Sequence, residues 1–147
     1  MNIISFDHAI IHFLRKAFIP TARFSIFVVY FWFGILKLLG FSPAGPLVHQ
    51  LFDATIHLVP FHTFYILFAL FEMLIGILFL IPKATRIVIP LLLVHMVTTL
   101  LPLILLPGAT WQGFLILTLE GQYIVKNLVI IAVAIGVAAH AHPLSNH

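Results

Sequence analysis

Four long apolar stretches, separated by short connections, set the main constraint on how this chain folds. They cover about residues 23–40, 62–81, 87–106 and 123–139. A helix needs about 20 mainly apolar residues to cross a bilayer, and each stretch is close to that length. Hydrophobic residues make up 63% of the chain and charged residues only 7%, a composition unlike that of soluble domains. We therefore predict an integral membrane protein.

The segments outside the four spans are too short for a second domain. We predict an all-α fold, a transmembrane four-helix bundle that forms one domain over residues 1–147. Residues 2–18 place apolar and basic side chains on different helical faces, which predicts an amphipathic helix in the membrane interface, ended by Pro20. Residues 47–59 alternate at helical spacing but are too short to cross, so they predict a short outer helix between the first two spans.

Basic residues are distributed unevenly along the chain, and this predicts an orientation. Those before the first span and between the second and third are Arg15, Lys16, Arg23, Lys83 and Arg86. The connections at 41–61 and 107–122 contain no Lys or Arg. By the positive-inside rule, both termini face the cytoplasm and the two longer connections face outward. We expect a multi-pass protein of a bacterial-type cytoplasmic membrane.

The composition also excludes several kinds of site. The chain has no cysteine, which removes disulfides, thiolate metal sites and iron–sulfur clusters. A redox role would therefore need a bound cofactor. The seven basic residues form no nucleic-acid-binding cluster, so we expect the lipid bilayer as a partner and no nucleic acid.

Two polar residues lie deep in the predicted spans, at matching depths. Glu72 is ten residues from the predicted outer end of its span at His62, and His95 is eleven from the outer end of the next span at Leu106. Antiparallel neighbours would bring the two together, and pairing would lower the cost of burying each. The pair is a candidate proton relay or ligand contact, and a static hydrogen bond between helices is the alternative.

A second polar layer is predicted nearer the outer surface. Lys37 and Lys126 each lie about three residues inside the outer end of a span. Glu120, Asp53 or a ligand would balance their charge, and Asn127 offers both a donor and an acceptor. We predict an outward-facing, ligand-binding pocket formed by Lys37, Glu120, Lys126 and Asn127; the alternative is that both lysines extend to lipid headgroups.

The histidines suggest metal or haem sites, but neither is expected. His49, Asp53 and His57 follow at four-residue steps in the short outer helix, and these are ligand types for Zn²⁺ or Cu²⁺. Residues eight apart lie about 12 Å apart along a helix axis, so all three cannot easily reach one ion. His95 is the deep histidine, and haem would need a second ligand from another chain or a non-histidine ligand.

Three segments resemble the DoxX-like superfamily of small four-helix membrane proteins, and most closely its YkgB-type branch. They are RFSIFVVYFWFGILKLLGF at 23–41, FEMLIGILFLI at 71–81 and LEGQYIVKNLVIIAVAI at 119–135. The most specific pieces are Gly34 to Lys37, Glu72 to Gly76, and Lys126 with Asn127. The superfamily more often has Lys-Asp at the last of these, so Asn127 removes a negative charge.

The resemblance implies quinone-linked redox chemistry, because the namesakes of the superfamily are associated with it. A quinone suits the residues physically, since its carbonyls accept hydrogen bonds from Lys and Asn, and Glu72 and His95 could carry its protons. A partner would have to bring the electron carrier, so we expect a protein partner or larger membrane complex. The alternatives are a non-catalytic accessory subunit of such a complex and a small transporter or proton channel.

Overall fold

The computed structural model describes residues 3–56 and 58–141, which contain four helical segments long and apolar enough to cross a membrane. These segments belong to α1 (Ile3–Leu38), α3 (Phe61–Phe79), α4 (Thr85–Leu100) and α7 (Leu119–Ala139). The segment of α4 also includes η1 (Pro82–Ala84) before it and α5 (Pro102–Leu105) after it. The protein is therefore a multi-pass membrane protein with an all-α membrane core, as predicted.

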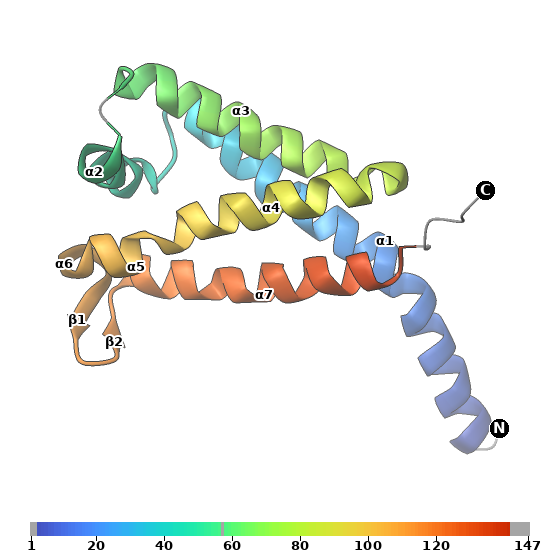
Figure 1. Ribbon diagram of the computed structural model, residues 1–147. Coiled ribbons are helices and arrows are strands. Elements are labelled where there is room, and N and C mark those ends of the chain that lie inside the picture. Colours follow the sequence, from blue (N-terminus) through green and yellow to red (C-terminus); the bar gives the residue numbers. More distant parts are fainter. Residues whose placement is uncertain (1–2, 57, 142–147) are drawn as a thin grey trace.

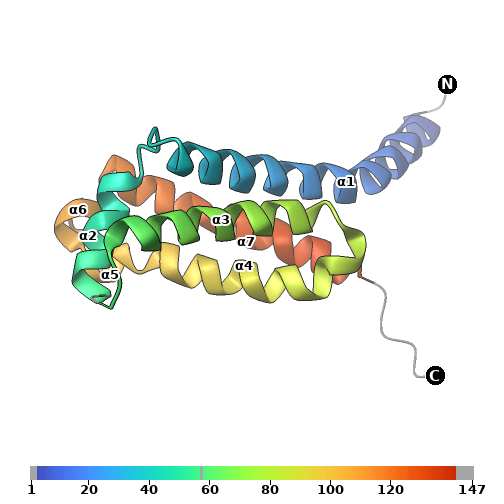
Figure 2. The same cartoon turned by 90° about the horizontal axis from the view of Figure 1, so that it is seen from above.

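The four long helices pack in a ring in which each contacts two neighbours. The contacting pairs are α1 with α3, α3 with α4, α4 with α7, and α7 with α1. Figure 2 shows that the helices run nearly alongside one another over most of their length. Their buried core consists of apolar side chains, namely Ala22, Ile26, Ile75, Phe79, Val88, Leu92, Met96, Ala134 and Val137, together with Tyr30.

Large apolar side chains also cover the outside of the bundle. Trp32, Leu67, Val94 and Val129 are each about 61 to 65% exposed. Such side chains on the outer faces of four apolar helices are suited to contact with lipid chains rather than water. The inner faces hold the polar groups described below.

The first helix is the main departure from the predicted architecture. The interfacial helix predicted to end at Pro20 and the span predicted from residue 23 are one continuous helix, α1. Proline removes one backbone hydrogen bond and bends a helix, but it does not have to end one, and membrane helices tolerate it. Figure 1 shows the N-terminal third of α1 leaving the bundle at an angle. Residues 3–16 of this part are all exposed.

Short elements connect the helices at the end of the bundle opposite this projection (Figure 1). The predicted outer helix at 47–59 is present as α2 (Gly45–Thr55). After α5, the chain forms α6 (Pro107–Thr110) and a small antiparallel hairpin of β1 (Trp111–Gly113) and β2 (Ile116–Leu117). The hairpin was not predicted. The Thr118 hydroxyl then caps α7 by accepting a hydrogen bond from the Gly121 amide at 3.1 Å.

Two glycines let α1 and α3 approach closely. A Cβ atom added to Gly34 would lie 2.8 Å from the Ala69 carbonyl oxygen. One added to Gly76 would lie 3.1 Å from the Phe31 amide nitrogen and 3.2 Å from the Phe27 carbonyl oxygen. Small residues are favoured where membrane helices cross because association there depends on close packing. The two glycines therefore set the distance across which side chains of α1 and α3 can meet.

Candidate functional site

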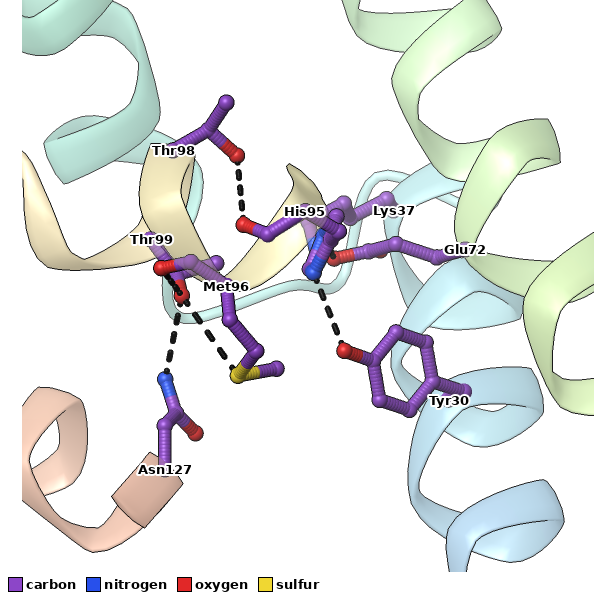
Figure 3. A network of polar contacts seen from close by, with 8 residues as sticks. All are labelled: Tyr30, Lys37, Glu72, His95, Met96, Thr98, Thr99 and Asn127. Carbon is purple, nitrogen blue, oxygen red and sulfur yellow. Dashed lines mark hydrogen bonds and ion pairs between the residues drawn. The ribbon is translucent and has the colours of Figure 1, made fainter. Parts of the chain in front are cut away.

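The Glu72 carboxylate, on the inner face of α3, connects side chains from two other helices (Figure 3). The Lys37 ammonium of α1 donates a hydrogen bond to Glu72 Oε2 at 2.7 Å. His95 Nε2 of α4 lies 3.1 Å from Glu72 Oε1. The predicted contact between Glu72 and His95 is therefore present, and Lys37 joins it.

Tyr30 extends this network on the other side of the imidazole. Its hydroxyl oxygen lies 3.1 Å from His95 Nδ1, so both ring nitrogens of His95 have a protein partner. Lys37 and Glu72 are each 6% exposed, His95 is 4% exposed and Tyr30 is 3% exposed. We call these four residues the Lys–Glu–His–Tyr network.

The donors and acceptors of the network match one another. A carboxylate can only accept hydrogen bonds, so Glu72 in its ionised form accepts from both Lys37 and His95 Nε2. In the neutral tautomer of His95 that carries its proton on Nε2, Nδ1 is the acceptor for the Tyr30 hydroxyl. Every hydrogen bond then has one donor and one acceptor, with one positive and one negative charge in close contact. This pairing lowers the cost of holding an ammonium and a carboxylate inside a membrane protein.

Aromatic rings pack against two members of the network, His95 and Lys37. The Phe68 ring stacks on the His95 imidazole with centroids 5.1 Å apart, and the Lys37 ammonium lies 5.7 Å from the centroid of the same ring. Phe71 packs on another side of the imidazole at 6.1 Å. Electrostatic interactions are stronger in such water-poor surroundings, and displacement of any one charged member becomes more costly.

Helical periodicity explains why these side chains point inward. Glu72 shares the buried face of α3 with Ala69, Gly76 and Phe79, at steps of three or four residues. In α4, His95 follows Val88 and Leu92 on the buried face at similar steps. These steps return side chains to one face of a helix.

Two features at the end of α1 bring Lys37 to the network. Tyr30, Gly34 and Lys37 are all buried on the same face of the helix. The helix ends at Leu38, one residue after Lys37, where Gly40 has a φ of 76° and the Phe41 amide bonds the Leu36 carbonyl oxygen at 2.9 Å. This is the hydrogen bond of a glycine-terminated helix end. Lys37 therefore lies in the last turn of α1, on its buried face.

The structure gives the other predicted pocket residues different partners. Lys126 is exposed on α7, and its ammonium lies 4.9 Å from the ring centroid of Tyr123 on the same helix. The Asn127 amide donates to the Thr99 hydroxyl of α4 at 3.4 Å, and Glu120 is exposed in the first turn of α7. No contact in the described part of the chain joins Lys37 to these residues. Their role in ligand binding stays a prediction.

The metal-site residues are placed only in part. His49 Nε2 lies 3.9 Å from an Asp53 carboxylate oxygen, and both side chains are more than half exposed. His57 lies outside the described residues. Among residues 3–56 and 58–141, no group of three or more His, Cys, Asp or Glu side chains is placed to hold a metal ion.

Tyr30 is the member of the network that sequence reasoning missed. It lies seven residues before Lys37, a spacing that places two side chains on nearly the same face of a helix. Arg23 lies a further seven residues back and is also bonded to other helices, to the Phe79 carbonyl at 3.0 Å and the Thr85 hydroxyl at 2.6 Å. The seven-residue spacing of Arg23, Tyr30 and Lys37 was therefore the sequence pattern that could have identified Tyr30.

The comparisons with known proteins give no relative. No family model, no curated protein and no solved structure matches this chain. Any assignment of function therefore rests on the residues and on their geometry.

Tyr30→Phe is expected to destabilise the protein by about 1 to 3 kcal/mol, because it removes a buried donor and leaves His95 Nδ1 unpaired. Thermal unfolding of the purified protein in detergent would measure the change. Tyr123→Phe is the matched control, because Tyr123 is 60% exposed. Equal stability of the two variants would contradict a hydrogen bond of this strength at His95.

Proposed function

We propose that this multi-pass membrane protein handles protons for a membrane-soluble quinone, as a quinone-interacting protein or a subunit of a redox complex, and that it is of the DoxX-like kind. The observation that carries the proposal is the buried Glu72 carboxylate, which accepts hydrogen bonds from both Lys37 and His95. Ionisable side chains are costly inside membranes, and where they occur they commonly mark proton or ligand pathways.

The composition of the network suits proton exchange. A proton that reaches Glu72 neutralises the carboxylate and weakens its electrostatic attraction to the Lys37 ammonium. His95 can pass on a proton because its two nitrogens contact different groups, Glu72 on one side and Tyr30 on the other. The network therefore contains acid and base groups in direct contact, from α1 through α4 to α3.

The donors and rings around Lys37 fit a quinone. An ammonium has three N–H donors, and within the described residues one hydrogen bond of Lys37 is used, to Glu72. The remaining donors suit a carbonyl oxygen, and Phe68 offers a flat aromatic surface beside the ammonium. Reduction of a quinone to a quinol consumes two electrons and two protons. A chain without cysteine would depend on a partner for the electrons.

A second candidate is a non-catalytic accessory subunit of a larger membrane complex. The feature that favours it is the projecting N-terminal part of α1, where Ile3 is 84% exposed and Phe13 is 68% exposed. In addition, each of the four network residues has a partner within the chain. A network in which every member has a protein partner would also serve a purely structural role.

One preparation tests both candidates. The protein would be purified from its native membrane in mild detergent and examined by mass spectrometry for bound quinones and proteins. We expect bound quinone, and its loss in the double variant Lys37→Met/Glu72→Gln, which removes both charges of the ion pair. Lys16→Met is the control, because Lys16 is exposed on the projecting part of α1.

The outcomes separate the candidates. Quinone retained equally by the double variant would contradict a role of the network in binding it. A stoichiometric protein partner without quinone would favour the accessory subunit, and a preparation with neither would contradict both candidates.

A further inference from the structure

A groove of about 890 Å³ opens beside the part of α1 that bends away from the bundle, and none of its lining residues belongs to the Lys–Glu–His–Tyr network. Its walls come from α1 around Pro20, the turn that contains η1, the start of α4 and the end of α7. It lies at the end of the bundle opposite α2 and the hairpin (Figure 1). The groove is within the size range of ligand-binding clefts in proteins.

The groove is positively charged. Arg23, Lys83 and Arg86 line it, with His140 at the end of α7. None of the described residues that line it is acidic. Arg23 and Lys83 at one cleft, with no acidic side chain among the described residues of its lining, favour an anionic ligand.

Arg23 is held rigidly with its donors only partly used. Its Nη1 donates to the Phe79 carbonyl oxygen at 3.0 Å, and its Nη2 donates to the Thr85 hydroxyl at 2.6 Å. The Nε atom is buried and has no hydrogen-bond partner in the part of the chain that the structure describes. A guanidinium has five N–H donors, so one N–H on each of Nη1 and Nη2 remains for a ligand beyond the bonds to Phe79 and Thr85. A phosphate group matches such a set of donors well.

The rest of the groove is apolar, which indicates what else the ligand carries. Phe24, on the groove wall, is 58% exposed, and Leu80 is 44% exposed. Ile19 completes this apolar side. A small inorganic anion would leave these side chains uncovered, whereas an amphiphile would place its chains against them.

We propose that this groove binds an anionic phospholipid, with its phosphate group near Arg23 and Lys83 and its acyl chains against Phe24 and Leu80. Basic pockets between membrane helices on the cytoplasmic side are suited to acidic headgroups. The groove lies among the basic residues that predict the cytoplasmic side of this protein.

Lipid binding to the delipidated protein in neutral detergent tests this proposal. The probes are dioleoyl phosphatidylglycerol, dioleoyl phosphatidylcholine and inorganic phosphate, and binding is measured by native mass spectrometry and by the shift in Tm. We expect phosphatidylglycerol to bind and raise Tm more than either other probe. Lys83→Glu should weaken phosphatidylglycerol binding roughly tenfold or more, since it replaces an attraction with a repulsion.

Lys16→Glu is the matched control, since it makes the same charge change at an exposed residue of α1 that does not line the groove. It should leave lipid affinity nearly unchanged. Lys83 is itself exposed, so its replacement should not prevent folding. An equal loss of affinity in the two variants would show general charge attraction and overturn the site. Stabilisation by inorganic phosphate equal to that by phosphatidylglycerol would overturn the assignment to a lipid.

Discussion

Glu72→Gln is expected to cost about 3 to 5 kcal/mol of stability, the range for breaking one partner of a buried ion pair. The carboxamide has an NH₂ group in place of an acceptor, so one of its two neighbours, Lys37 or His95, would face a donor. The Lys37 ammonium would also be left as an uncompensated charge at 6% exposure. Unfolding in a mixed-detergent titration would measure the loss.

The double variant Lys37→Met/Glu72→Gln should recover much of this stability, since it leaves no uncompensated charge and the carboxamide oxygen can still accept from His95. The coupling between the two single variants would then measure the ion pair itself. Glu120→Gln is the matched control because Glu120 is exposed in the first turn of α7. A double variant less stable than Glu72→Gln alone would contradict an interaction carried by the pair.

Gly76→Val is expected to cost about 3 kcal/mol, at the upper end of the range for overpacked interiors. The new side chain would meet the backbone of α1, with its Cβ 3.1 Å from the Phe31 amide nitrogen, so a change of rotamer cannot relieve the contact. The helices would have to separate, and Lys37 and Glu72 would separate with them. The same unfolding titration would measure this loss.

Gly108→Val is the control for this substitution. A Cβ atom on Gly108 meets nothing within 4 Å, so the variant should be close to the unmodified protein in stability. If Gly76→Val and Gly108→Val were equally stable, α1 and α3 would not be in close contact at Gly76.

Counting residues along the spans predicted one contact of the site correctly. Glu72 and His95 could be placed at the same depth because a tight turn joins α3 to α4, and the contact is present at 3.1 Å. When a short turn joins two antiparallel helices, the depth of a residue in either helix can be counted from that same turn. Rise per residue then relates the two side chains directly.

The same counting did not reveal the partner of Lys37. It assigned Lys37 to a layer nearer the outer surface than Glu72, whereas the structure pairs these two side chains. Depth says nothing about how a helix is rotated about its axis, and a long connection through α2 separates α1 from α3. The closeness of α1 to α3 depends on Gly34 and Gly76, whose packing role appears only when the two helices are placed together.

Two other differences have local causes. Pro20 was interpreted as a helix end, but a proline in an apolar helix also fits a bend within it, and a single sequence does not separate the two. The hairpin of β1 and β2 has only three and two residues per strand. Such short strands leave too little alternation for a sequence pattern to reveal.

Because α1 is one continuous helix, its polar contacts together fix its height and rotation relative to the neighbouring helices. Lipid chains and core side chains are similarly apolar. Burial alone therefore gives only a small difference in free energy between one height or rotation of a membrane helix and another. Along α1, Arg23 bonds the carbonyl of Phe79 and the hydroxyl of Thr85, Tyr30 contacts His95, and Lys37 bonds Glu72. These residues make polar contacts with other helices at seven-residue intervals along one helix. A slip of one turn or a quarter rotation would break all three together, so α1 has one setting against its neighbours.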